Sequence, residues 1–335
     1  MSQEFSGGTG HPRCGHIHGD SRMTGDMNAR EYSTRSRAGR TPETVAQVMA
    51  AAARLEPDGR GRLFAPASLQ SWPGIVHGGG LVALLDAAAR ALGAGDGPRR
   101  LEGRLTSSVP IATALDLEGH AERDAATVTI LERAQPLTSV TVDAGVTVDA
   151  GAADAEEPAP REWTVAGREG WPMPLSDQCL ACGAHNPLGL QLGLRWDRDG
   201  VWAHFRPRAS WRGPGDRIDP ALAPVLLDEV AWWLGALVTK EGGLTNRISV
   251  TLLRPDAAAP GPVTAVGRFA DVTPVDRRRI FWRTRAGVLG ADGTLLAVAT
   301  IVFRPGAEYS ARQMPFFRAR TDPEVFARMF PGYAG

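Results

Sequence analysis

The sequence contains few cysteines, only three among its 335 residues. Three are too few for a disulfide framework, so the chain is predicted to fold in the reducing cytoplasm. The N-terminal residues are polar and of mixed charge, without the apolar core of a secretory signal peptide. The most apolar run, residues 221–238, carries Asp228 and Glu229 and is short for a bilayer span. No membrane partner is therefore expected.

The chain also lacks a surplus of charge, because 37 Lys and Arg residues balance 37 Asp and Glu residues. Without a basic surplus, nothing in the composition argues for nucleic acid as a partner. The sequence has no Gly-x-Gly-x-x-Gly fingerprint after a strand, no P-loop and no Gly-x-Ser-x-Gly elbow. No cofactor is predicted.

The most informative stretch is Trp-Pro-Gly-Ile-Val-His-Gly-Gly-Gly-Leu-Val-Ala-Leu-Leu-Asp, from Trp72 to Asp86. A Pro/Gly turn leads to His77 and three glycines, and a helix is predicted over residues 78–92. The helix is apolar on nearly every side, which is typical of an interior position. Glycines at a helix start expose N–H groups that can polarise a carbonyl oxygen. Asp86 lies inside this helix, where an unpaired carboxylate is costly, so the stretch is a candidate site.

The surrounding segments predict an α+β fold in which antiparallel strands wrap a single long helix. A capped amphipathic helix is expected over residues 41–55. The first set of expected strands is 60–67, 101–109, 114–121, 125–132 and 137–148. The second set, around an apolar helix at 221–238, is 191–196, 201–207, 247–253, 263–272, 278–288 and 294–303.

These elements divide the chain into two similar units. We expect a disordered leader at 1–40, domains at 41–150 and 175–305, a linker at 151–174, and a C-terminal tail at 306–335 with a short surface helix. Aligning Leu-Leu-Asp-Ala-Ala with Leu-Leu-Asp-Glu-Val gives an offset of 142 residues. The offset matches Asp86 with Asp228, His77 with Asp219, and Gly78 with Pro220, which indicates a divergent internal duplication.

A turn, His-Gly-Gly and an apolar helix with an acid nine residues after the histidine resemble the hotdog-fold thioesterases, in particular the PaaI-like acyl-CoA thioesterases. The segment Cys179-x-x-Cys182-Gly-x-x-Asn186-Pro-x-Gly189-Leu resembles the lead-in to many hotdog domains. The resemblance implies two tandem hotdog domains that pair into a double hotdog. It also implies an acyl-CoA or acyl-carrier thioester substrate, bound where the domains meet. Association of several such chains is a further expectation.

In the family, an N–H group at one helix start polarises the thioester carbonyl, and a carboxylate on the facing helix acts as base or nucleophile. Asp86 lies eight residues beyond Gly78, about 12 Å along the axis, so it cannot serve its own helix start. An antiparallel partner helix can present its acid there. We therefore predict a catalytic site of His77, Gly78 and Gly79 with Asp228. Glu229 lies about 100° further around the helix, so only one of the two acids is expected to face this site.

The opposite pairing, Asp86 with Asp219 and Pro220, is predicted to be vestigial, although Asp86 remains a catalytic candidate. Proline has no N–H group to donate. Asp219 would place a second anion near Asp86 and near a developing oxyanion, which disfavours negative charge there. One competent site and one degraded site are therefore expected per chain.

Each candidate also has a structural interpretation. His77 can simply hold the helix start, the glycines can serve a tight turn, and Asp228 can be a satisfied buried carboxylate. Trp232 and Trp233 either pack in the core or line an acyl-binding pocket. Basic residues that can meet coenzyme A phosphates, or can simply be solvated, are Arg99, Arg100 and 277–279.

Two groups of residues have metal-ligand chemistry, yet neither predicts a metal site. Cys179, Cys182 and His185 lack a convincing fourth ligand nearby, so a turn entering a strand is the better interpretation. The second group belongs to a polar N-terminal segment without a fold signal and consists of His11, Cys14, His16 and His18.

The sequence thus predicts a thioester hydrolase and leaves two alternatives open. A hotdog lyase or dehydratase is one, although its Asp-x4-His pattern is not evident. The other is a non-catalytic protein that binds acyl thioesters or acts as a scaffold, because the second half lacks His-Gly-Gly and a fold alone does not establish activity.

Overall fold

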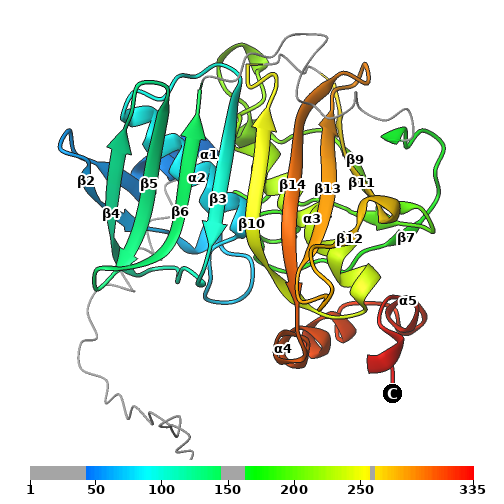
Figure 1. Ribbon diagram of the computed structural model, residues 1–335. Helices are drawn as coiled ribbons and strands as arrows, with labels where there is room; N and C mark the ends of the chain where they lie inside the picture. Colours follow the sequence, from blue (N-terminus) through cyan, green and yellow to red (C-terminus); the bar gives the residue numbers. More distant parts are fainter. Residues whose placement is uncertain (1–42, 145–162, 257–260) are drawn as a thin grey trace, which may run out of the picture. The chain divides into compact units, whose positions relative to one another are not determined.

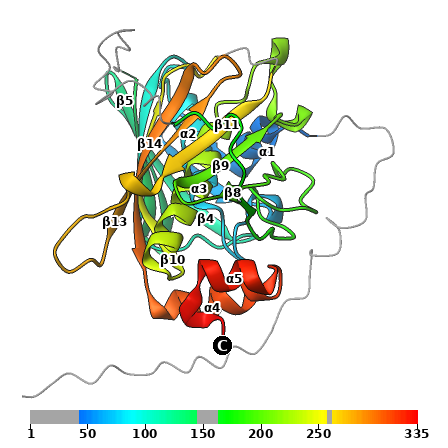
Figure 2. The same ribbon diagram turned by 90° about the vertical axis from the view of Figure 1, so that its right-hand side faces the viewer.

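The computed structural model describes residues 43–144, 163–256 and 261–335. Within these residues, one large antiparallel sheet carries two long helices on the same face (Figures 1 and 2). The expected leader at 1–40, with its histidines and Cys14, lies outside the described residues.

The first half begins with helix α1 (Val45–Ala52), whose start is closed by a capping box between Thr44 and Gln47. A 3-10 turn (Ala67–Leu69) precedes the central helix α2 (Gly78–Ala91), which follows the His-Gly-Gly motif as predicted. Its strands are β1 (Ala53–Leu55), β2 (Arg60–Phe64), β3 (Arg99–Leu105), β4 (Ala114–Ala121), β5 (Ala125–Glu132) and β6 (Gln135–Asp143). The structure gives β4 and β5 the bounds expected from their alternating apolar residues.

The second half is built around helix α3 (Leu222–Thr239), preceded by 3-10 turns at Ala209–Trp211 and Pro214–Asp216. Its strands are β7 (Trp171–Pro172), β8 (Arg195–Trp196), β9 (Gly200–Phe205), β10 (Gly243–Leu252), β11 (Val263–Arg268), β12 (Thr273–Pro274), β13 (Trp282–Leu289) and β14 (Leu295–Pro305). A third 3-10 turn, Phe269–Asp271, follows β11.

The two halves share one topology. The sheet order is β1-β2-β4-β5-β6-β3-β10-β14-β13-β11-β9-β8-β7, with β12 paired to β13. The segments β2-β4-β5-β6-β3 and β9-β11-β13-β14-β10 therefore repeat the same path outward from the join between β3 and β10. The offset of 142 residues also holds locally, because the isolated bridge Gln70–Val76 recurs as Arg212–Ile218. The described residues of the two halves thus share a strand order and this local bridge.

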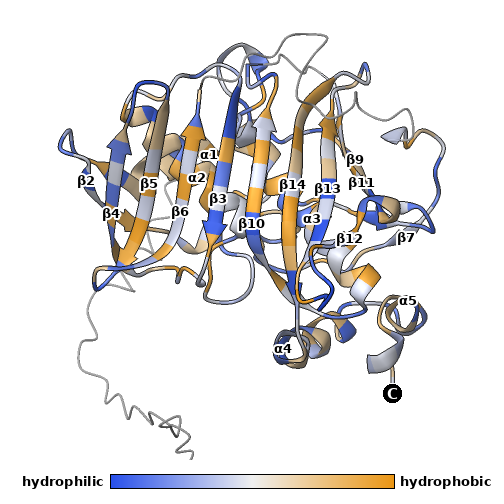
Figure 3. Cartoon of the chain, in the orientation of Figure 1, coloured by the Kyte–Doolittle hydropathy of each residue, from blue (hydrophilic) through white to orange (hydrophobic). Residues whose placement is uncertain are grey.

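Small residues let the helices lie close to the sheet. Val82 of α2 packs over Gly103 of β3, and Phe303 of β14 packs against Gly235 of α3. Figure 3 shows hydrophobic residues gathered along β10 and β14, which form the middle of the sheet. Helix α3 has the length and composition of a membrane-crossing helix, but 78% of it is buried inside the structure. It is a core helix, consistent with its apolar surface on all sides.

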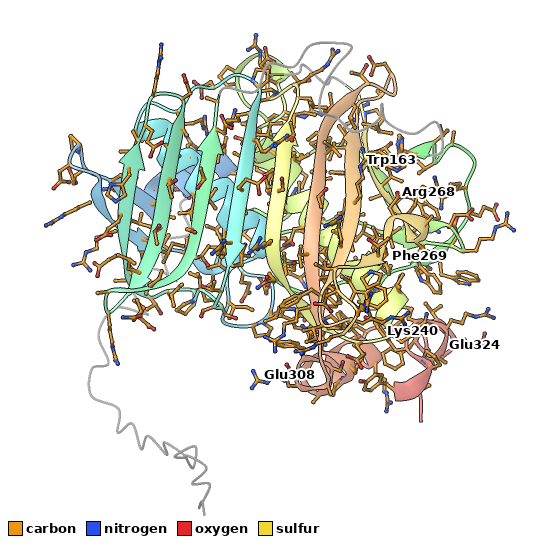
Figure 4. All side chains as sticks on the ribbon, viewed as in Figure 1. Trp163, Lys240, Arg268, Phe269, Glu308 and Glu324 are labelled. Carbon is orange, nitrogen blue, oxygen red and sulfur yellow. The ribbon has the colours of Figure 1, made fainter. Side chains whose placement is uncertain are left out.

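The structure describes the predicted linker, residues 151–174, only from Trp163 onward. Residues 151–162 lie outside the described residues, but Trp163 is buried against Gly287 of β13, and β7 adds a strand to the sheet (Figure 4). The predicted strand 191–196 shrinks to β8. The reason is that the N–H groups of Leu190 and Leu192 bond to the segment containing the cysteines instead of to the sheet.

The C-terminal tail is more than the short surface helix that the sequence predicts. It forms α4 (Ala307–Arg318), α5 (Pro323–Met329) and a 3-10 turn (Pro331–Tyr333). Both helices lie beyond one end of β10 and β14 in Figure 1. Five apolar side chains of the tail are buried in the main hydrophobic core: Met314, Phe317, Phe326, Met329 and Phe330.

Candidate active site

A cavity that is open to solvent lies where the two halves meet. The start of α2 lines it from the first half, and α3 and β10 line it from the second. Five of the predicted site residues line the cavity: His77, Gly78, Asp228, Trp232 and Trp233. It also contains residues that the sequence did not assign to the site, namely Glu229, Cys179, Cys182 and the α4 residues Tyr309, Phe316 and Phe317.

The first N–H groups of α2 differ in their hydrogen-bond partners. The N–H of Gly79 donates to Oδ2 of Asp228 at 2.8 Å, and that of Gly80 donates to Nδ1 of His77 at 3.3 Å. The N–H of Gly78 bonds to no residue that the structure describes. Because Gly78 also lines the cavity, its N–H is the donor available for a substrate oxygen. Of the two predicted oxyanion donors, the N–H of Gly78 is therefore the one available to a substrate, because the N–H of Gly79 is bound to the carboxylate of Asp228.

Glycine at these positions also allows the two helices to approach closely. A Cβ atom on Gly79 would collide with the backbone carbonyl of Pro224 in α3, and one on Gly78 would lie 2.8 Å from Oδ2 of Asp228. Neither Gly78 nor Gly79 has a positive φ, so the tight-turn interpretation is wrong, and what these positions require is the absence of a Cβ atom. The resulting contact between α2 and α3 sets where Asp228 sits.

Asp228 is the predicted acid from the facing helix, and its carboxylate is buried with two hydrogen-bond donors. Thr245 of β10 donates to Oδ1 at 2.7 Å, and Gly79 donates to Oδ2. Burial raises the pKa of Asp228, although His77, Thr245 and Gly79 counteract part of this rise. A carboxylate with a raised pKa is a stronger proton acceptor than an exposed aspartate.

Both acids reach the histidine, contrary to the expectation that only one faces the site. Oδ2 of Asp228 lies 3.4 Å from Nδ1 of His77, and Oε2 of Glu229 lies 3.3 Å from Nε2. Glu229 follows Asp228 in α3, and its longer side chain reaches Nε2 of the imidazole ring, whereas Asp228 approaches Nδ1. Burial alone would lower the pKa of His77, but hydrogen bonds with Cys179 and Glu229 raise it well above its usual value. A protonated ring would lose the bond from Gly80 and donate toward Asp228.

The segment that contains Cys179 and Cys182 lies next to the same histidine. Cys179 and Cys182 are buried, and their thiols form a hydrogen bond with each other. This bond lowers the pKa of Cys179 to about 6 and raises that of Cys182 well above its usual value. His185, the third ligand considered from the sequence, is instead exposed and lies beside Asp177. The predicted turn is present, and both of its cysteines line the cavity.

Asp86 does not line this cavity. Its two oxygens bind Nε and an Nη atom of Arg99, each at 2.7 Å, in a fully buried pair, and Arg90 approaches at 3.6 Å. Arg99 also donates to the carbonyls of Asp96 and Gly97. The structure thus places Asp86 in the core as an ion-pair partner. It likewise removes Arg99 from the candidates for coenzyme A phosphates, because its side chain is 0% exposed.

The start of α3 differs from that of α2 as the sequence predicted. Asp219 replaces the histidine, and its side chain accepts the N–H of Ala221 at 2.9 Å. A smaller cavity adjoins Asp219 and Pro220, and Asp86 does not line it. Burial raises the pKa of Asp219, an effect opposed by the Ala221 N–H and by Arg90.

This raised pKa predicts a pH-dependent gain in stability for Asp219→Asn. A raised folded-state pKa means that folding disfavours the ionised carboxylate, so a neutral isostere should be more stable at pH 7. The gain should fade as the pH decreases through the raised pKa toward about 4, where the wild-type carboxyl is itself protonated. Urea unfolding at several pH values measures this difference. The exposed Asp124→Asn serves as the matched control, and a gain independent of pH would contradict the burial argument.

Aromatic side chains line the cavity beside the polar groups. The indole N–H of Trp232 donates to the carbonyl of Gly243, and that of Trp233 approaches Oε1 of Glu229 at 3.4 Å. Phe316 and Phe317 of α4 pack edge-on against Trp72, which precedes the His-Gly-Gly motif. The core and pocket interpretations of the two tryptophans therefore both apply. The aromatic pair Phe316-Phe317 was visible in the sequence, but its partner was not.

Comparison with known proteins agrees with this fold. No family model matches the sequence, and no curated protein matches it. A candidate thioesterase II from Thermobifida fusca is similar in structure, with a TM-score of 0.56 and 12% identity, over 77% of this chain and 99% of the other. A candidate thioesterase from Novosphingobium aromaticivorans gives a TM-score of 0.53 and 18% identity, over 76% and 99%.

A third similar structure, from Alicyclobacillus acidocaldarius, is described as a conserved protein of unknown function with a hotdog fold. Its TM-score is 0.53 at 18% identity, over 77% of this chain and 98% of the other. At such identities the likeness establishes the fold, and the chain has the hotdog fold that its His-Gly-Gly helix start predicted. The assignment to the PaaI-like group stays a prediction.

Proposed function

We propose that the protein hydrolyses acyl thioesters of the acyl-CoA class in the cavity between its two halves, which form a tandem double hotdog. The observation that carries this proposal is that Gly78 and the buried Asp228 line the same cavity. The N–H of Gly78 bonds to no residue that the structure describes. Each group comes from a different half, as in the pairing that the hotdog thioesterases use. The structural likeness to candidate thioesterases supports the same chemistry.

In this reaction the thioester carbonyl oxygen accepts the Gly78 N–H, whose dipole stabilises the negative charge that develops there. Asp228, held by Thr245 and Gly79, takes a proton from water as the water oxygen attacks the carbonyl carbon. The carbon–sulfur bond then breaks, and the proton passes to the leaving thiolate. Direct attack by the carboxylate, followed by hydrolysis of the anhydride, uses the same groups.

The aromatic side chains indicate an apolar acyl group. Trp72, Trp232 and Phe316 line one cavity with His77 and Asp228. Apolar atoms of a substrate gain roughly 25 cal/mol per Å² of surface removed from water in such a site. The coenzyme A part would extend toward the open mouth of the cavity.

The test is release of free thiol from a panel of acyl-CoAs with short, medium and aromatic acyl groups. We expect saturable turnover, with apolar and aromatic acyl groups favoured over acetyl. Saturable binding of acyl-CoA without turnover of any member would overturn the hydrolase proposal and support the non-catalytic binding protein instead.

A further inference from the structure

We propose that His77, Cys179 and Glu229, with Cys182 next to them, form a binding site for one zinc-class divalent metal ion. Nothing in the hydrolysis scheme above uses the two thiols, and the metal proposal does not depend on that scheme. The sequence alone suggested zinc only through Cys179, Cys182 and His185 and lacked a fourth ligand. The structure supplies two other ligands, one from each of the helices that meet at the cavity.

Three donors converge. Nε2 or Nδ1 of His77, Sγ of Cys179 and a carboxylate oxygen of Glu229 all lie within 4.8 Å of one another. Cys182 is buried next to this group and lines the same cavity. Nitrogen and oxygen ligands of a tetrahedral zinc ion lie about 3.4 Å apart, given metal–ligand distances of about 2.0–2.2 Å. The distance between Nε2 of His77 and Oε2 of Glu229 is 3.3 Å, so this pair already has the required spacing.

Neighbouring groups orient the proposed ligands. The indole N–H of Trp233 points to the second oxygen of Glu229 at 3.4 Å, and the backbone N–H of Ala181 donates to Sγ of Cys179 at 3.4 Å. On the far side of the imidazole ring, Oδ2 of Asp228 lies 3.4 Å from Nδ1. A histidine that binds metal through Nε2 commonly donates Nδ1–H to a carboxylate, which fixes the ring. Cys179 and Glu229 therefore each have a supporting partner, and metal binding through Nε2 would replace the bond from Gly80 to Nδ1 with a bond from Nδ1–H to Asp228.

The local backbone brings the two sulfur atoms together. The N–H of Gly183 donates to the carbonyl of Cys179, which closes a turn over Cys-x-x-Cys. A Cβ atom on Gly183 would collide with the backbone of Cys179, so only glycine allows this tight turn. All four side chains are buried or nearly so. Thiolates and imidazole favour zinc over magnesium or calcium, and binding would release the thiol protons to solvent.

Such a metal ion would have a structural consequence. It would tie the cysteine segment to His77 at the start of α2 and to Glu229 in α3, and so fix one wall of the cavity. The three protein ligands leave the fourth position of a tetrahedral zinc ion open.

The experiment measures metal content on the full-length chain. Reduced protein is stripped with a chelator, reconstituted with Zn²⁺, desalted and analysed by elemental mass spectrometry. We expect one zinc per chain in the wild type and at least a tenfold loss of affinity in Cys179→Ser and Glu229→Gln. His185→Ala should bind as the wild type does, because its side chain is exposed and outside the cluster. This control separates the structural ligand set from the one that the sequence suggested.

A second readout needs no variant. Co²⁺ added to the stripped wild type should give a sulfur-to-cobalt charge-transfer band, which requires thiolate ligands. Absence of both stoichiometric zinc and this band would overturn the proposal, as would unchanged zinc affinity in both ligand variants or loss of zinc in His185→Ala. Thiol release from acyl-CoA is assayed on the same samples, and either result there leaves the metal measurement intact.

Discussion

Asp228→Asn is expected to lower kcat for thioester hydrolysis by roughly 10²- to 10⁴-fold, the usual contribution of a positioned general base. Asparagine has nearly the same shape, and its oxygen can still accept the Gly79 N–H while its NH₂ group faces Thr245. The substrate and its carbonyl contact with Gly78 should therefore be little affected, so KM should change much less than kcat. Stopped thiol-release assays on wild type and variant measure the two constants.

The matched control for this variant is Asp116→Asn, which removes an exposed carboxylate paired with Arg62 at the surface. Its kcat should equal that of the wild type. Full activity of Asp228→Asn together with inactivity of Asp86→Asn would transfer the role of base to Asp86 and contradict the proposed site. Unfolding curves of each variant show whether a lost activity reflects chemistry or a lost fold.

Arg99→Met is expected to lower the free energy of unfolding by about 3–5 kcal/mol, the usual cost of removing one member of a buried ion pair. The side chains of Arg99 and Asp86 are 0% and 3% exposed, and Asp86 depends on Arg99 for its two shortest bonds. The variant leaves that carboxylate without these bonds in the core. Equilibrium unfolding in urea measures the loss.

Two controls separate the cost of an unpaired charge from that of a changed shape. The double variant Asp86→Leu/Arg99→Met removes both charges and should recover much of the stability. Arg62→Met breaks a pair whose side chains are 73% and 50% exposed, so it should cost less than about 1 kcal/mol. If Arg99→Met is as stable as the wild type, the buried pair does not contribute as described.

Local signals predicted much of the fold. The start of α2 at Gly78 and the bounds of β4 and β5 follow from glycine placement and period-two alternation, which depend on near neighbours in the chain. The repeat offset of 142 residues then placed Asp228 opposite the start of α2. The structure bears out this contact through the bond from Gly79.

The rest of the site depends on contacts that no local pattern encodes. His77 and Glu229 are 152 residues apart in the chain, and helical geometry alone predicted that Glu229 faces away. The cysteine segment looked like a turn because its partners, His77 and Glu229, come from other elements. The aromatic residues of α4 looked like a surface helix because the cavity that they line is formed mainly by elements far away in the sequence. Each of these errors concerns long-range packing.

The joining of the two halves through β3 and β10 has a consequence for how the protein can change. In a dimer of identical subunits, every substitution alters both equivalent sites. Here each half is encoded separately, so one helix start can keep His77 and its glycines while the other acquires Asp219 and Pro220. Asp86 can therefore form a buried ion pair with Arg99, while Asp228 remains in the cavity.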